Sequence, residues 1–233
     1  MKHSGKARRA AFKMILLSLV AGIALWLVFT FATALATILT VMAVAAMPIL
    51  IVLWFLFAGF TLYFFRDPNP RVPDGANLVV SPGHGKVDVI DTVTEPQFMG
   101  GKCQRISIFL SVFDVHVQNA PVSGKVAFFK YTTGQFLNAL KTESALHNEN
   151  VLLGLEGSEP RGQKIGVRLI AGVIARRIVP FVQQGDEVAR GDRMSLIQFG
   201  SRVDLYLPLN AKIKAQLGAK VVGGETVLAE LDF

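Results

Sequence analysis

The sequence predicts two parts: an N-terminal transmembrane helical hairpin, and after it a mainly β domain built from interlocked half-barrels. Residues 14–65 form a 52-residue stretch that contains no Asp, Glu, Lys, Arg or His. Beyond it, short runs rich in Val, Ile, Leu and Phe alternate with glycine-containing turns, as strands do. Two short segments of this second part are also echoed later in the chain. We therefore expect a basic N-terminus over 1–13, a membrane anchor over 14–65 and a β domain over 66–233.

As one continuous helix, the uncharged stretch would be roughly 78 Å long at about 1.5 Å per residue. A bilayer core is about 30 Å thick and is crossed by about 20 residues. Two crossings therefore fit, with a short turn within 32–42, and Pro48 would kink the second helix. A cleavable signal peptide has an apolar region of only about 7–15 residues, so we expect a retained anchor. The alternative is a buried helical hairpin of a soluble protein.

The distribution of charge predicts the orientation of the anchor. Of the net charge of +7, five positive charges precede the apolar stretch: Lys2, Lys6, Arg8, Arg9 and Lys13. Positive flanks stay cytoplasmic, and two crossings return the chain to the same side. The β domain is thus expected in the cytoplasm, at the inner face of the cell membrane. The basic tail suits anionic lipid head groups, and no nucleic acid partner is expected.

Cys103 is the only cysteine, so the chain has neither an internal disulfide nor a cysteine-based metal site. A single cysteine agrees with a reducing compartment, and its apolar surroundings in the sequence indicate core packing. No metal site of any kind is expected.

The β domain begins after a linker at 64–75, whose three prolines and one glycine end the preceding helix. One short helix is expected around 135–141. The runs of apolar residues predict strands at 78–80, 87–90, 105–113, 125–131, 151–155, 165–178, 194–199 and 203–207.

The internal echoes indicate how these strands are arranged. Residues 81–87 (Ser-Pro-Gly-His-Gly-Lys-Val) are echoed by 120–126, and residues 184–188 by 217–221. Short strands turned at such repeats suit a sandwich of half-barrels. The pattern resembles biotinyl and lipoyl carrier domains, so the expected fold is a barrel-sandwich hybrid. A carrier needs a modifiable lysine at a hairpin tip, and residues 199–204 contain none.

The apolar run at 196–208 is interrupted by the pair Gly200 and Ser201. A serine hydroxyl can attack the preceding backbone carbonyl when the backbone is strained toward it and a base is near. Gly200 has no Cβ and lets the hydroxyl approach. Taken alone, the pair also fits a tight turn or bulge between strands. A serine hydrolase is a weaker alternative, because the Gly-x-Ser-x-Gly elbow is absent.

Several segments, in order, resemble the short bacterial and archaeal phosphatidylserine decarboxylases, and the resemblance covers residues 64–232. They are residues 64–68 (Phe-Phe-Arg-Asp-Pro), 105–126, 148–150 (Asn-Glu-Asn), 170–179 and the Gly200-Ser201 pair. The resemblance implies a zymogen that cuts itself before Ser201 into chains 1–200 and 201–233, which remain together as an α/β heterodimer. Ser201 would become a covalent pyruvoyl cofactor. Phosphatidylserine would form a Schiff base with this group and lose carbon dioxide to give phosphatidylethanolamine.

The resemblance also implies roles for individual residues. His116 matches the family's active-site histidine, which suits proton transfer. Either Arg176 or Arg177 would bind the substrate phosphate or carboxylate, since adjacent strand residues point to opposite faces. Alternatively, both arginines are solvated, and residues 148–150 form only a polar turn. The expected partners are phosphatidylserine, the lipid bilayer and the cleaved fragment, with a homo-oligomer left open.

One segment departs from the family pattern. The family usually has Ser-Pro-Ala-Asp-Gly-Lys-Val at 81–87, and its aspartate serves self-processing, whereas this chain has Gly83 and His84. A neutral imidazole could activate Ser201 as a base, although it supplies no fixed negative charge. Three outcomes stay open: His84 replaces the aspartate, cleavage is slow, or the chain is an uncleaved, inactive homologue. Such a homologue would act as a membrane-tethered lipid-binding or scaffold protein.

Overall fold

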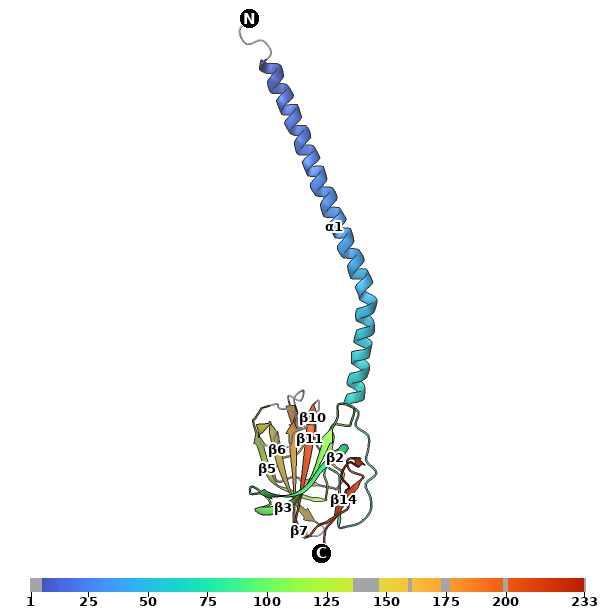
Figure 1. The fold of residues 1–233 in the computed structure, drawn as a ribbon, viewed down its shortest axis with the longest axis vertical. Coiled ribbons are helices and arrows are strands. Elements are labelled where there is room, and N and C mark those ends of the chain that lie inside the picture. Colours follow the sequence, from blue (N-terminus) through green and yellow to red (C-terminus); the bar gives the residue numbers. More distant parts are fainter. Residues whose placement is uncertain (1–5, 136–146, 159–160, 173–176, 199–200, 233) are drawn as a thin grey trace. The chain divides into compact units, whose positions relative to one another are not determined.

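The computed structural model describes residues 6–135, 147–158, 161–172, 177–198 and 201–232 (Figure 1). The chain divides into two compact units, Met1–Phe60 and Thr61–Phe233. The described part of the first unit is helical and belongs to α1 (Lys6–Phe64), whose last turn lies in the second unit. The second unit holds all the described strands.

The prediction of a turn within 32–42 is wrong, because α1 runs through these residues without interruption. This segment contains neither glycine nor proline, and its polar side chains bond to the helix itself. The hydroxyls of Thr33, Thr37 and Thr40 donate to backbone carbonyls three or four residues earlier, at 2.9–3.0 Å. Pro48 lies within the helix and does not end it. The helical hairpin of the expected fold is thus replaced by one long helix.

The helix is apolar on every side. Its Phe12–Phe64 portion is 53 residues long, reaches a mean hydropathy of 2.6 in an 18-residue window, and is long and apolar enough to cross a membrane by length and composition. Large side chains such as Trp26, Phe31 and Leu39 are more than half exposed. A helix that is apolar all round is typical of one surrounded by lipid or by a protein core.

The expectation of a mainly β domain is confirmed. Within the described residues the strands form one eight-stranded sheet, in the order β13-β2-β3-β11-β7-β6-β5-β9, and two three-stranded sheets, β1-β14-β12 and β4-β10-β8; all strand pairs are antiparallel. The strands are β1 (Leu78–Val80), β2 (Gly85–Glu95), β3 (Gly101–Leu110), β4 (Val117–Asn119), β5 (Gly124–Thr132), β6 (Asn150–Ser158), β7 (Arg161–Ala171), β8 (Arg177–Pro180), β9 (Glu187–Val188), β10 (Arg193–Gln198), β11 (Ser201–Leu207), β12 (Lys212–Ile213), β13 (Lys220–Val221) and β14 (Val227–Glu230).

The large sheet curls into a half-barrel, and the long strands β2 and β3 curve across the domain in Figure 1. The tip of the β2–β3 hairpin reaches back to β6, where the ring of Phe98 lies so close to Gly154 that a Cβ there would be 2.5 Å from it. The Phe98 ring also lies 5.9 Å from that of Phe128 on β5. The main core is formed by buried aliphatic side chains of both the large and the small sheets.

The sequence echoes occupy equivalent places in the fold. Gly85 begins β2 and Gly124 begins β5. β2 pairs with the two-residue strand β13, which lies in the repeat at 217–221, and β5 pairs with β9, which lies in the matching repeat at 184–188. Val87 N donates to Ala219 O at 3.0 Å, and Val126 N donates to Asp186 O at 2.8 Å. Each strand also has a register shift directly after that valine. The domain is therefore built from two similar halves, as the echoes predict.

The predicted strand limits fail where a turn or a change of sheet follows. The strand expected at 105–113 ends at Leu110, because residues 111–114 form a turn closed by Asp114. The strand expected at 165–178 is two strands in different sheets, β7 and β8. The short helix expected at 135–141 lies outside the described residues except for Gln135, which forms a bridge with Asn148.

The proline-rich linker is bound to the β domain rather than extended in solvent. Arg193 on β10 donates to the carboxylate of Asp67 at 2.5 Å and to the side-chain carbonyl of Asn69 at 2.8 Å. Further along, the backbone N–H of Arg71 donates to Glu225 at 2.9 Å. The segment that follows α1 is thus held in one place on the second unit.

Candidate active site

Ser201 is the first residue of β11, a strand in the interior of the large sheet. Its backbone pairs with Leu110 on β3 and with Ala171 on β7. The side chain is 0% exposed, and its Oγ has no hydrogen-bond partner among the described residues. Leaving a buried hydroxyl unsatisfied costs about 1–3 kcal/mol, and such a group calls for an explanation. No hydrogen bond to a described residue therefore occupies the Ser201 hydroxyl, which fits a group kept for chemistry.

The alternation along β11 decides which way Ser201 points. Val203 and Leu205, on the same face as Ser201, belong to the main core, while Arg202 and Asp204 face the other side of the sheet. The turn at 81–84 lies against the core side: a Cβ on Gly83 would lie 3.5 Å from Val203 and 3.7 Å from Leu110. The turn that carries His84 therefore packs against the same end of β11 that begins with Ser201.

His84 is partly buried and packs against Gly223, where a Cβ would lie 3.0 Å from the imidazole Nε2. Burial lowers the pKa of His84, and the nearby guanidinium of Arg66 lowers it further, against the raising effect of Asp114, Glu225 and Asp67. The imidazole is therefore neutral at neutral pH and can accept a proton.

His116 is fully buried, and its Nδ1 lies 2.9 Å from the carbonyl oxygen of Asp114. A carbonyl only accepts, so Nδ1 carries the proton and Nε2 of the neutral ring keeps its lone pair. Burial lowers the pKa of His116 to about 4; the bond to Asp114 and its charge oppose this shift, while Arg66 and His84 add to it. His116 is thus a neutral imidazole with a defined tautomer, suited to accept a proton at Nε2.

The last turn of α1 holds the loop that carries His116. The buried ring of Phe64 lies against the imidazole, with 4.2 Å between ring centroids. Arg66 and the hydroxyl of Tyr63 both donate to the carbonyl of Phe113, at 2.6 and 3.2 Å. Because these residues belong to the second unit, the end of the apolar helix is a structural part of the site.

A buried amide supports His116 from the other side. Gln118 on β4 donates to the carbonyl of His116 at 2.6 Å and accepts from the hydroxyl of Ser195 on β10 at 2.7 Å. The backbone N–H of Ile197, also on β10, donates to the same carbonyl at 3.1 Å. β10 leads toward Ser201 in the sequence, so one strand both fixes His116 and approaches the Gly-Ser pair.

The predicted substrate-binding arginines are only partly described. Arg176 and Gly200 lie outside the described residues, whereas Arg177 is exposed at the start of β8, in register with Gln198. Residues 148–150 are buried rather than a solvated turn. Asn148 donates to the carbonyl of Ala171 at 2.7 Å, at the end of β7 that pairs with Ser201.

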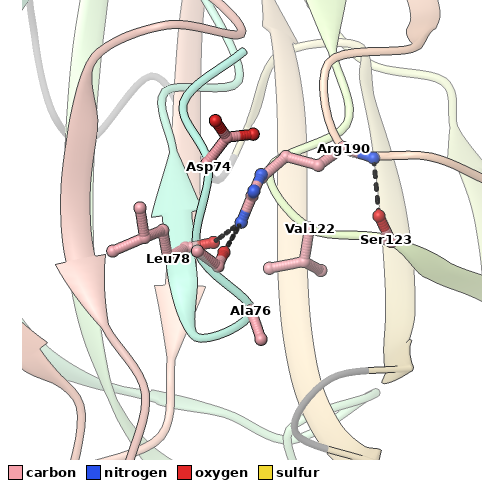
Figure 2. A pocket seen from close by; sticks show the side chains of 7 residues that line it. Asp74, Ala76, Leu78, Val122, Ser123 and Arg190 are labelled. Atoms are coloured by element: carbon pink, nitrogen blue, oxygen red, sulfur yellow. Dashed lines mark hydrogen bonds between the residues drawn. The ribbon is translucent and has the colours of Figure 1, made fainter.

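A hollow of about 200 Å³ is lined by none of the candidate site residues and has a structural role (Figure 2). Figure 2 shows Arg190 extending along it, with a guanidinium nitrogen donating to the carbonyls of Gly75 and Leu78. The backbone N–H of Arg190 donates to Ser123 Oγ at 2.9 Å. These bonds attach the linker to the second half of the domain, and the hollow is not a candidate active site.

Sequence reasoning missed the residues that hold the site residues in place through contacts. Phe64 was expected as part of the anchor and linker and of the family-like segment 64–68, but nothing in the sequence links it to His116. Asp114 stands two residues before His116, and a Ser-x-x-Asp turn signal at 111–114 could have identified it. The ion pair of Asp88 with Arg202 joins residues 114 positions apart, which no local pattern reveals.

Comparison with protein families matches residues 57–229 to the family described as phosphatidylserine decarboxylase. Relatives named phosphatidylserine decarboxylase proenzyme include one from Desulfotalea psychrophila, 43% identical over 191 residues, which are 82% of this chain and 88% of the relative. Another from Citrifermentans bemidjiense is 45% identical over 179 residues, 77% and 80% of the two chains. A third from Erythrobacter litoralis is 46% identical over 182 residues, 73% and 72% of the two chains.

Burial of neutral His116 predicts a pH-dependent stability. Between pH 6.5 and about 4 the unfolded chain takes up a proton on this residue and the folded chain does not. The folded state therefore loses about 3 kcal/mol of its free energy of unfolding through His116 as the pH falls from 6.5 to about 4. We predict that His116→Gln reduces the loss of unfolding free energy between pH 7.5 and pH 4.5 by about 2 kcal/mol.

The measurement is urea unfolding in detergent, with every protein carrying Ser201→Ala so that a single chain unfolds. The control is His147→Gln, which changes an exposed histidine and should leave the pH dependence as it was. Equal pH dependence in His116→Gln and its parent would contradict the prediction.

Proposed function

The chain belongs to the phosphatidylserine decarboxylase family, and we propose that it converts phosphatidylserine to phosphatidylethanolamine and carbon dioxide after cutting itself between Gly200 and Ser201. The single observation that carries the proposal is the buried Ser201 hydroxyl at the start of an interior strand, without a hydrogen-bond partner among the described residues. Its position matches the family's self-cleavage serine, and its surroundings leave the hydroxyl available.

The self-cleavage uses atoms of this chain and one water molecule, which supplies the keto oxygen in the last step. Ser201 Oγ attacks the carbonyl carbon of Gly200, the amide nitrogen of Ser201 leaves as an amine, and an ester remains. Loss of the Cα proton then breaks the Cβ–Oγ bond, which leaves a carboxylate on chain 1–200 and dehydroalanine at residue 201. Hydrolysis of dehydroalanine releases ammonia and gives the pyruvoyl group. A base near Ser201 is needed for the first step.

The residues present fit a pyruvoyl cofactor at residue 201. When formed, this group supplies a ketone that accepts electrons as carbon dioxide leaves an amino acid. The chain would hold it at the start of β11 between β3 and β7. Neutral His116 would hold or move a proton at Nε2, and Arg177 or Arg176 would bind the phosphate or carboxylate of the substrate.

The packing of the 201–233 segment supports a heterodimer of the two cleaved chains. β11 pairs with β3 and β7, β13 with β2, and β14 with β1, so each of these strands is bound to the 1–200 segment. Cutting one peptide bond leaves all these pairings in place. The paired halves described above support a barrel-sandwich hybrid as the fold of the heterodimer. A homo-oligomer stays an untested expectation.

We further infer that the apolar segment inserts in the cell membrane and that the β domain is cytoplasmic. The all-round apolar surface of α1 supports insertion in a membrane, and the basic residues before it support a cytoplasmic N-terminus. At about 1.5 Å per residue the Phe12–Phe64 portion spans roughly 80 Å, more than twice the thickness of a bilayer core. A cytoplasmic β domain requires this segment to cross the membrane an even number of times, so the proposal needs α1 to turn back within the bilayer; an uninterrupted α1 would cross once and place the β domain on the other side.

Self-cleavage predicts two masses for the wild-type protein. Denaturing mass spectrometry should detect chains 1–200 and 201–233, the second beginning with a keto group. Ser201→Ala should remain a single chain without decarboxylase activity, because the attacking hydroxyl is gone. Ser158→Ala, at an exposed position on β6, should cut as the wild type does. A wild-type protein that stays whole after prolonged incubation would support the inactive homologue instead.

The base for cleavage is predicted to be His84. His84→Ala should slow the formation of chain 201–233 by about a hundredfold, within the usual range for loss of a general base. His84→Asp, which restores the residue usual in the family, should cut at a rate near that of the wild type. His116→Ala should be cut and then fail to decarboxylate. Cleavage of His84→Ala at the wild-type rate would show that another group is the base.

The proposed topology can be tested with single cysteines in a Cys103→Ala protein. Lys2→Cys reports the N-terminus, and Lys125→Cys reports an exposed position on the β domain. Neither should react with a membrane-impermeant maleimide in intact spheroplasts, and both should react once the membrane is opened. Labelling of Lys125→Cys in intact spheroplasts would place the β domain outside the cytoplasm.

A further inference from the structure

Arg202, the second residue after the proposed cut, is held by a partly buried ion pair. Its side chain is 1% exposed, and its two terminal nitrogens donate to the two carboxylate oxygens of Asp88, Nη1 to Oδ1 at 3.1 Å and Nη2 to Oδ2. Asp88 lies on β2 and Arg202 on β11, so the pair spans β3, the strand between them. A paired guanidinium and carboxylate of this geometry fix each other in both position and orientation.

Asp88 stands at an irregularity of its strand. Val87 and Val89 pair with Ile108 and Ser107 on β3, and Asp88 has no register partner between them. A bulge of this kind redirects a side chain. Here the carboxylate at the bulge reaches across β3 to Arg202.

The second half of the domain shows that the bulge does not need the carboxylate. The equivalent strand, β5, has the same Gly-Lys-Val start and the same register shift, and the residue at the shift is Ala127. The backbone geometry is thus built without an acidic side chain in one half. Asp88 is present in the half that packs beside Ser201, which separates its role from that of forming the fold.

Self-cleavage would make residue 201 the first residue of a 33-residue chain. Chain ends fray unless they are tied down. The backbone of Ser201 is paired with Leu110 and Ala171, and the next residue, Arg202, adds an anchor through its side chain. We propose that Asp88 is a positioning residue, which through Arg202 holds the new chain end, and the keto group it carries, in register for decarboxylation. This inference rests on the proposed function.

The test compares Asp88→Asn with Asp91→Asn in the full-length protein. Asp91 lies three residues further along β2 and forms a similar two-bond pair with Arg105, at 2.6 and 2.9 Å. Cleavage is followed by mass spectrometry, keto groups are counted with a hydrazine reagent, and kcat and KM are measured on phosphatidylserine in mixed micelles. Asp88→Asn should be cut and carry its keto group, while kcat per keto group falls about tenfold and KM stays near wild type. Asp91→Asn should match the wild type.

A double variant separates positioning from a general loss of stability. If Asp88 acts only through Arg202, Asp88→Asn combined with Arg202→Gln should lose no more kcat than Arg202→Gln alone. Wild-type kcat in Asp88→Asn, an equal loss in Asp91→Asn, or additive losses in the double variant would each overturn the proposal. An uncut Asp88→Asn would also overturn it, since Asp88 would then act in cleavage itself. An uncut wild-type protein would instead mean that the proposed function has failed.

Discussion

β11 lies between β3 and β7, and its backbone is hydrogen-bonded along both edges from Ser201 onward. Side chains alternate along it, so that Val203 and Leu205 enter the core while Arg202 and Asp204 face the other side of the sheet. A slip of one residue would bury the charges in the aliphatic core and expel the aliphatic side chains, at a large cost in free energy. The register of β11 therefore fixes the position of Ser201 in the sheet, and every proposed step of the chemistry depends on that position.

The second element of the site is the end of the apolar helix. Phe64 packs on the His116 ring, and Arg66 and Tyr63 bind the carbonyl of Phe113 in the preceding turn. The membrane anchor of the proposed enzyme thus does more than raise the local concentration of a lipid substrate. Its last turn contributes to the burial that lowers the pKa of His116 and keeps the imidazole neutral.

Much of the β domain could be predicted from sequence because its signals are local. The run at Leu78–Val80 is a strand as expected, and the two echoes mark equivalent places in two similar halves. Prediction failed where the deciding interaction is distant. The strand expected to reach residue 113 stops at Leu110 because Asp114 closes a turn, and the stretch expected at 165–178 is divided because β8 joins a different sheet.

In the candidate site, too, local motifs could be predicted and contacts between distant residues could not. Ser201 and His116 were found because short motifs carry them, and the structure puts one at the start of an interior strand and the other in a buried loop. The residues that hold them, such as Phe64, Gln118 and Asp88, act through contacts across the fold and have no signature in a single sequence. The expected turn in the anchor failed for another reason: no residue within 32–42 breaks a helix.

The most direct test of the central claim is amide hydrogen exchange in β11, compared between the cut wild-type protein and uncut Ser201→Ala. If pairing with β3 and β7 fixes the start of this strand independently of the peptide bond before it, the amides of residues 202–206 should exchange slowly, and at similar rates, in both proteins. Exchange in the cut protein that is faster by orders of magnitude, or fast exchange in both, would contradict the account.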